Sequence, residues 1–218
     1  MLVPMTLVAL AVGVIAAWMW PPIGYVVAGV MLLFVLWGFW FFRDPVRTPA
    51  SNDPEAVISP ADGKVIKVDV AELPKELREA AAAQGITGPL PRVSIFLNLF
   101  DVHVNRAVSA GTITKIVYSP GQFVNASFDK ASELNERSVV LMKDQRGRTL
   151  AFAQIAGLVA RRIVNHLREG QTVSAGERFG LIRFGSRAEI WMPAGTEISV
   201  KVGQRVVAGQ TVMAVRKS

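Results

Sequence analysis

The first 42 residues of the chain contain no charged side chain. Thirty-four of them are apolar, and the other eight are Gly, Pro or Thr. A helix that crosses the hydrocarbon core of a bilayer needs about 20 apolar residues. The ranges 2–20 and 23–42 both meet this length, and the pair Pro21–Pro22 interrupts a continuous helix. We therefore expect a helical hairpin over 1–42 that anchors the protein at a membrane, either spanning the bilayer or lying in its interface.

The residues that flank this hairpin indicate its orientation. Arg43 and Arg47 follow it directly, and the positive-inside rule then places the rest of the chain on the cytoplasmic side of the cell (inner) membrane. No basic segment precedes the apolar run, and no small-residue cleavage site follows it. Both absences from the sequence argue against a cleavable signal peptide.

All 41 charged residues lie in the remaining 176 residues, where 24 Lys and Arg outnumber 17 Asp and Glu and give a net charge of +7. This part is long enough to build a core of its own. Its basic residues are scattered, without the aromatic-interleaved stripe of nucleic-acid-binding proteins, so we expect no nucleic-acid partner. The charge fits attraction to an anionic lipid surface, or a generic solubilising surface. The lack of cysteine excludes thiol nucleophiles and disulfides.

After the hairpin, the chain consists of short β-branched runs separated by Gly and Pro. Such runs predict an antiparallel sandwich or barrel. One helix is expected over 74–84, which is rich in Ala, Glu, Lys and Arg. The segments 170–183 and 203–216 share the pattern G-x-x-V-x-x-G, which resembles the hammerhead units of lipoyl- and biotinyl-type barrels. The expected fold is therefore mainly β with few helices (α+β), a barrel-sandwich-like domain over 43–218 preceded by the hairpin.

Taken singly, few residues point to chemistry, and no group of them suggests a metal site. Asp62 lies in an Ala-Asp-Gly turn, a common use of Asp and Gly. His103 lies on an expected strand, where alternation places it on one face with Asp101 and Asn105. A single strand histidine is more often structural than catalytic. The other histidine, His166, lies among basic residues near a turn.

Six strings acquire meaning when they are read together and in order. They are FFRDPVRTP (41–49), SPADGKV (59–65), FDVHVNR (100–106), NASFDKASELNER (125–137), GLVARRIV (157–164) and ERFGLIRFGSR (177–187). In this order they resemble the phosphatidylserine decarboxylase family, in its short bacterial and archaeal form. The resemblance runs from Phe41 to the C-terminus, and an N-terminal hydrophobic hairpin is also usual in that family.

The resemblance implies a self-processing enzyme that depends on a pyruvoyl group. In this family the serine hydroxyl, here that of Ser186, attacks the carbonyl of Gly185, and β-elimination and hydrolysis then leave an N-terminal pyruvoyl group. The products are a large chain, 1–185, and a small chain, 186–218, which form a heterodimer; a higher oligomer stays open. The pyruvoyl carbonyl forms a Schiff base with the anionic phospholipid phosphatidylserine and supplies the electron sink for its decarboxylation to phosphatidylethanolamine.

The resemblance also assigns a base to the cleavage reaction, which serine requires because it is a weak nucleophile. Asp62 and His103 match the family's Ser-His-Asp processing arrangement. Longer members carry a second histidine in the same strand, where this chain has Arg106. His103 therefore serves alone, or it shares its role with His166.

Two arginines are candidate substrate-binding residues. Arg137 matches the N-E-R string of the family and fits either a role in the processing loop or a contact with the substrate carboxylate. Arg187 departs from the family pattern, because the common L-G-S-T is F-G-S-R here. It fits a charge-assisted contact with the lipid phosphate, or a solvated position on a strand.

A non-enzymatic alternative is a membrane-anchored adaptor with a lipoyl-like barrel. The anchor and the repeated pattern fit it, but such adaptors carry a long helical hairpin, and the one helix expected here is short. Two aromatic residues near the string NASFDK, Phe123 and Phe128, are candidates for dipping into the lipid headgroup layer, but we expect them in the ordinary core and assign no membrane contact to them.

Overall fold

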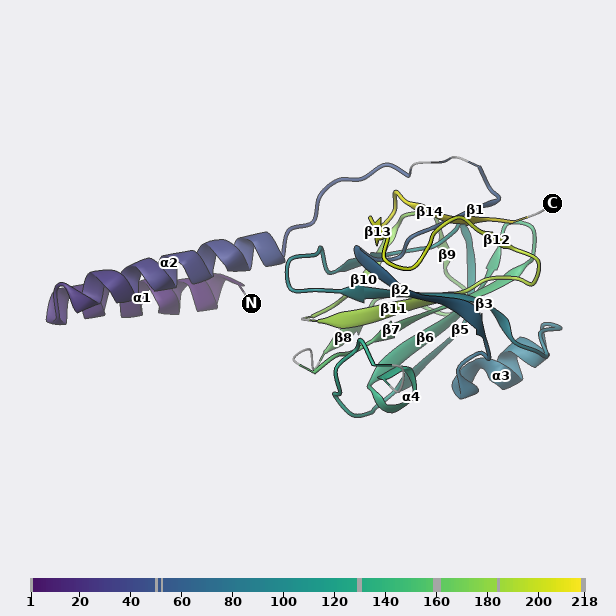
Figure 1. The fold of residues 1–218 in the computed structure, drawn as a ribbon, viewed down its shortest axis with the longest axis horizontal. Helices are drawn as coiled ribbons and strands as arrows, with labels where there is room; N and C mark the ends of the chain where they lie inside the picture. Colours follow the sequence, from purple (N-terminus) through teal and green to yellow (C-terminus); the bar gives the residue numbers. More distant parts are fainter. Residues whose placement is uncertain are drawn as a thin grey trace. The chain divides into compact units, whose positions relative to one another are not determined.

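The computed structural model describes residues 2–49, 51, 53–128, 131–158, 162–183 and 185–216 (Figure 1). The chain divides into two compact units, Met1–Asp44 and Pro45–Ser218. Parts of the strings that carry the family resemblance lie outside the described residues, namely Asp129, Lys130, Val159, Ala160, Arg161 and Phe184.

The N-terminal unit contains a pair of apolar helices, as predicted. They are α1 (Leu2–Met19) and α2 (Ile23–Phe41), and they pack against each other on either side of the proline pair. Most of their large apolar side chains are exposed. Helix α2 is long and apolar enough to cross a membrane, whereas α1 is somewhat shorter. This unit therefore supports membrane association through at least one helix.

The second unit is mainly β-structure, which confirms the predicted fold class. Its largest sheet curls (Figure 1) and has the strand order β13 (Arg205–Val206), β2 (Gly63–Ala71), β3 (Leu90–Leu97), β11 (Ser186–Trp191), β7 (Thr149–Ile155), β6 (Arg137–Asp144), β5 (Gly111–Ser119) and β9 (Thr172–Val173). Two three-stranded sheets have the orders β1 (Ala56–Ile58), β14 (Val212–Val215), β12 (Glu197–Ile198), and β4 (Val104–Arg106), β10 (Arg178–Ile182), β8 (Ile163–Asn165). The pairs between these named strands are antiparallel.

Strand β11 lies in the middle of the large sheet and contributes to a different apolar cluster on each side. Ile190 packs in the larger cluster with Phe152, whereas Trp191 packs in a second cluster with Leu77 of α3 (Lys75–Ala82). Successive side chains of a strand point to opposite faces. The strand therefore has two faces: the Ser186 face, made of Ser186, Ala188 and Ile190, and the Arg187 face, made of Arg187, Glu189 and Trp191.

The helix expected over 74–84 is confirmed as α3, and its buried Leu77 and Ala81 face the sheet. The chain leaves it through Gly85, whose φ of +84° suits glycine. A four-residue helix, α4 (Ala131–Leu134), was not predicted. It is too short to produce a helical repeat of apolar residues in the sequence.

The expected strand around His103 is interrupted by a turn between β3 and β4. The backbone N–H of Asn98 donates to Asp101 Oδ2 at 2.9 Å, and the N–H of Phe100 donates to Asn98 Oδ1 at 2.7 Å. Asn and Asp side chains that bind nearby backbone in this way stabilise turns. The prediction that His103 lies within a strand is therefore wrong, since it immediately precedes β4.

Candidate functional site

Three of the predicted site residues lie on segments that meet at one end of the large sheet. Ser186 begins β11 and pairs with Leu97, the last residue of β3. Asp62 directly precedes β2, which pairs with β3. The carbonyl of His103 accepts a hydrogen bond from the N–H of Ile182 at 3.2 Å, at the end of the strand that leads into β11. The sheet therefore brings together residues that are distant in sequence.

Ser186 is fully buried, with 0% of its surface exposed. Among the residues that the structure describes, its Oγ has no hydrogen-bond partner. A buried polar group left without a partner costs on the order of 1–3 kcal/mol. Gly185 before it has a φ of +61°, a conformation that residues with a side chain rarely adopt. Such a costly arrangement is more typical of a reactive site than of a structural serine.

Gly157 makes room for the carbonyl group of the Gly185–Ser186 bond. A Cβ atom at position 157 would lie 1.6 Å from the carbonyl oxygen of Gly185, far closer than any real contact. It would also lie 3.4 Å from the Cβ of Ala126. This role was not predicted, because the string GLVARRIV contains the glycine but does not indicate which atoms lie against it.

Asp62 is held by Arg47 and by the C-terminal part of the chain. Arg47 donates to both carboxylate oxygens, at 2.5 and 2.9 Å, and to the carbonyl of Ala208 at 2.9 Å. The N–H of Ala208 donates to Asp62 Oδ1 at 2.8 Å. A two-pronged guanidinium contact fixes the orientation of a carboxylate. In the sequence, Arg47 indicates only a charge that flanks the membrane segment, and nothing near it predicts this pairing.

The two histidines lie in different surroundings. His103 is buried, with 3% of its surface exposed, whereas His166 is exposed. A buried imidazole is the better candidate for exchanging a proton with a buried serine. Arg106, at the position of the family's second histidine, donates to the carbonyls of Gly176 at 3.0 Å and Pro45 at 2.9 Å. It therefore holds two segments of this unit together.

Arg187 lies on the face of β11 opposite Ser186, within a buried polar network. It is 1% exposed, forms an ion pair with Glu189 at 2.7 Å, and donates to Ser94 Oγ at 3.0 Å. It also donates to the backbone carbonyl of Phe128 at 3.3 Å. The interpretation of Arg187 as a solvated strand residue is therefore wrong, because other segments of the chain cover it.

Arg137 points to the same side of the sheet as Arg187. Each lies directly opposite Ile155 of β7 in a neighbouring strand, and residues directly opposite each other point to the same face. Its guanidinium forms an ion pair with Glu76 of α3. Burial alone would raise the pKa of Glu76, but hydrogen bonds from Arg137, the Glu76 backbone and Ser119 outweigh it and lower that pKa below its usual value. The contacts of Glu76 therefore favour the ionised form of this one carboxyl group.

A cavity of about 570 Å³ opens on this side of the sheet. Its lining includes Arg92, Arg137, Glu189 and Trp191. The Ser186 side chain belongs to the other face of β11, so the sheet separates it from the cavity. The structure thus gathers Asp62, His103 and Ser186 at one end of the sheet and places the two candidate substrate-binding arginines on its opposite side.

Comparison with known proteins gives matches along most of the chain. The family model for phosphatidylserine decarboxylase matches residues 34–214. A relative from Erythrobacter litoralis is 46% identical over 91% of this chain and 90% of its own length, one from Magnetococcus marinus is 52% identical over 84% and 80%, and one from Novosphingobium aromaticivorans is 51% identical over 80% and 70%. Each is named phosphatidylserine decarboxylase proenzyme. The family match includes every residue of the candidate site.

Proposed function

The chain belongs to the phosphatidylserine decarboxylase family, and from this premise we propose that it decarboxylates phosphatidylserine by means of a pyruvoyl group made from its own Ser186. The observation that carries the proposal is the fully buried Ser186 hydroxyl, without a partner among the described residues, directly after a glycine with positive φ. An adaptor without enzymatic activity does not fit membership of a family of enzymes, so that alternative is set aside.

In the proposed cleavage, Ser186 Oγ attacks the carbonyl carbon of Gly185. The buried His103 takes the hydroxyl proton, since proton removal makes serine an effective nucleophile. Asp62, fixed by Arg47, has the role of orienting and charge-stabilising that histidine. The Gly185 oxygen occupies the space that Gly157 leaves open, and this contact limits where the attacked carbon can lie.

The remaining steps break the chain. The Gly185 acyl group moves from the nitrogen of Ser186 to its Oγ, which forms an ester and frees the amine. Loss of the Ser186 Cα proton then expels the carboxylate of Gly185 and leaves a dehydroalanine. Water then attacks the Cα of this dehydroalanine, and the nitrogen departs as ammonia. A ketone, the pyruvoyl carbonyl, remains at the new N-terminus. The resulting chains are 1–185 and 186–218.

The pyruvoyl carbonyl supplies what side chains lack, a sink for the electron pair that remains when CO₂ leaves. The buried Ser186 position fits such a group, because burial limits the access of the bulk water that would protonate the carbanion indiscriminately. His103 is the proposed proton donor to that carbon. The hydrogen bonds of Arg187 to Ser94 of β3 and to the carbonyl of Phe128 support a role in holding β11 against other segments, whereas contacts of Arg137 or Arg187 with the lipid remain predictions.

We further infer that the enzyme works at the inner membrane, with its β-rich unit on the cytoplasmic side. The apolar helix α2 supports membrane association. Arg43 lies just beyond its end, stacks over Trp40 at 4.2 Å and donates to the Trp40 carbonyl at 2.7 Å. A basic residue with an aromatic neighbour is typical of the cytoplasmic end of a membrane helix. Arg47 is instead engaged with Asp62, so Arg43 carries this inference.

The test is the mass of the purified protein together with its activity on phosphatidylserine. We expect two chains divided between Gly185 and Ser186, with the smaller chain blocked to N-terminal sequencing. Ser186→Ala should remain one chain and lose all decarboxylation. Ser174→Ala, at an exposed position, serves as the matched control and should be cleaved and active. An intact wild-type chain without activity, or an active Ser186→Ala variant, would refute the proposal.

A further inference from the structure

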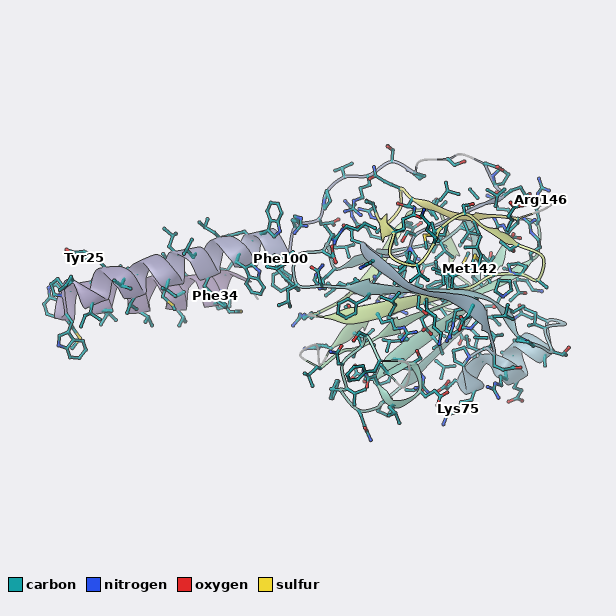
Figure 2. The ribbon with its side chains drawn as sticks, in the orientation of Figure 1. Tyr25, Phe34, Lys75, Phe100, Met142 and Arg146 are labelled. Atoms are coloured by element: carbon teal, nitrogen blue, oxygen red, sulfur yellow. The ribbon has the colours of Figure 1, made fainter. Side chains whose placement is uncertain are left out.

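Four large apolar side chains are exposed on loops around the proposed cleavage site. We call them the apolar rim: Leu99 (42% exposed), Phe100 (67%), Phe128 (62%) and Leu158 (62%). Figure 2 shows Phe100 on the loop at this end of the unit. The expectation that Phe128 belongs to the ordinary core is therefore wrong, whereas Phe123 is partly buried. Single exposed apolar residues need no explanation, but a group at one site does.

The loops of the apolar rim leave the sheet next to the first residue of β11. Phe100 follows β3, whose last residue pairs with Ser186. Leu158 directly follows Gly157, which lies against the carbonyl of the bond to be cleaved. The backbone carbonyl of Phe128 accepts a hydrogen bond from the residue after Ser186. The apolar rim is therefore built onto the segments that position the reacting bond.

On the loops that carry Leu99, Phe100 and Leu158, the charges suit an anionic surface, whereas Phe128 has carboxylates close to it in sequence, at Asp129 and Glu133. The loop between β3 and β4 contains one carboxylate, that of Asp101, and it is buried in an ion pair with Arg205. Arg162, after the loop that carries Leu158, is exposed. An exposed carboxylate would be repelled by anionic lipid headgroups, whereas exposed arginines are attracted to them.

We propose that the apolar rim inserts into the headgroup layer of a bilayer and so brings the site around Ser186 onto the membrane surface. Two observations select lipid as the occupant. The same chain carries α2, which is long and apolar enough to hold this unit beside a bilayer. The rim also borders the position where the reactive group is to form, so a protein seated there would obstruct a lipid headgroup. The delivery of substrate rests on the proposed function, but the lipid contact does not.

The lipid contact is tested without any activity measurement. Because the chain has no cysteine, Phe100→Cys, Phe128→Cys and Val70→Cys can each carry a single NBD fluorophore. Val70 is the matched control, since it is 65% exposed and pairs with Pro91. Pro91 is about 20 Å along β3 from the residue that pairs with Ser186, at roughly 3.3 Å per residue.

The labelled full-length protein is placed in vesicles of phosphatidylcholine and phosphatidylserine that contain doxyl-labelled lipid. We expect the doxyl lipid to quench the fluorophore at positions 100 and 128 strongly, and at position 70 weakly. Equal quenching at all three positions overturns the proposal. The proposal is also overturned if the fluorescence changes with protein concentration and not with the doxyl lipid. That result would mean that a second copy of the chain covers the apolar rim.

The double variant Phe100→Ser with Phe128→Ser separates lipid contact from chemistry. Its kcat/KM on phosphatidylserine in vesicles should fall about tenfold further than on a water-soluble short-chain phosphatidylserine, because two apolar contacts with the bilayer are lost. Val70→Ser should change neither value. Equal losses on both substrates would overturn the proposal. If the unsubstituted enzyme decarboxylates neither substrate, the proposed function fails, and the quenching result alone decides the lipid contact.

Discussion

The two faces of β11 differ in the number of partners that their buried polar side chains have. On the Ser186 face, the hydroxyl is buried and has no hydrogen-bond partner among the described residues. On the Arg187 face, Glu189 is equally buried, and its Oε1 accepts from Arg187 at 2.7 Å, Ser94 at 2.9 Å and Ser132 at 3.0 Å, although Glu189 Oε2 and Arg187 Nε have no partner among the described residues. Burial alone therefore does not distinguish the proposed reactive serine from a structural residue, whereas the number of hydrogen-bond and ion-pair partners differs between them. We expect substitutions on the first face to cost reactivity and substitutions on the second to cost stability.

The largest effect after loss of Ser186 itself is expected from His103→Gln. Removing the proposed base should slow chain cleavage by about 10²- to 10⁴-fold, the usual contribution of general base catalysis. A time course of cleavage on denaturing gels after synthesis measures this rate. The matched control is His166→Gln, at an exposed position, which should cleave normally. The opposite pattern would transfer the role of base to His166.

Gly157→Ala should slow cleavage by about 100-fold, because an added Cβ must displace the Gly185 carbonyl by an ångström or more. Two other glycines separate this effect from general damage. Gly88→Ala has open space around its Cβ and should be neutral. Gly111→Ala would place its Cβ 2.1 Å from the carbonyl oxygen of Lys143, so it should lower the melting temperature without slowing cleavage of the folded chain. Normal cleavage by Gly157→Ala would contradict the positioning role.

Glu189→Gln probes the opposite face. The amide keeps the size of the carboxylate but removes the charge that compensates Arg187, so the free energy of unfolding should fall by about 2 kcal/mol. Cleavage of the folded protein should continue. The measurement is denaturant unfolding in detergent, made in the uncleaved Ser186→Ala background so that one chain unfolds. A variant that stays stable and fails to cleave would remove the distinction between the two faces.

The smallest expected effect concerns Asp144, away from both faces of β11. Burial alone would raise its pKa, but hydrogen bonds from the backbone and side chain of Arg148, together with the charge of Arg216, outweigh it and lower that pKa. A carboxyl with a lowered pKa in the folded state stabilises the protein above its ordinary pKa, and this stability is lost as the pH falls.

Asp144→Asn should therefore cost about 1 kcal/mol at pH 7. It should also flatten the decline in unfolding free energy between roughly pH 5 and 3. Unfolding measured across this range, beside the unsubstituted protein, checks both expectations. An unchanged slope would mean that other carboxyl groups govern acid unfolding.

Features with a local cause were predictable from the sequence. The helix over 74–84 has both a helix-forming composition and a stop signal, and the apolar pair of helices follows from an uncharged run divided by prolines. Strands with turn signals between them indicated the mainly β fold. The break before His103 was missed, although Asn98 and Asp101 are turn-forming residues, because apolar residues on both sides suggested a continuous strand.

Features with a distant cause were not predictable. The alternation of Arg187 and Glu189 with apolar neighbours indicates a polar face, but nothing local shows that this face is covered. The contact of Gly157 with Gly185 and the pairing of Arg47 with Asp62 join segments that only the folded chain brings together. The family resemblance identified Asp62, His103 and Ser186 as one group, but it did not identify Arg47 and Gly157, which contact Asp62 and the Gly185 carbonyl.

The central position of β11 has a consequence for how the proposed enzyme is made. A cut before Ser186 leaves β11 hydrogen-bonded to β3 on one side and β7 on the other, while β13 and β14 of the same short chain pair with β2 and β1. The precursor folds as a single molecule in a first-order process. Once cut, the denatured protein can return only by encounter of two chains, so refolding becomes second-order and dilution opposes it. The proposed cleavage would therefore change the assembly of this protein from a reversible event into one that dilution opposes.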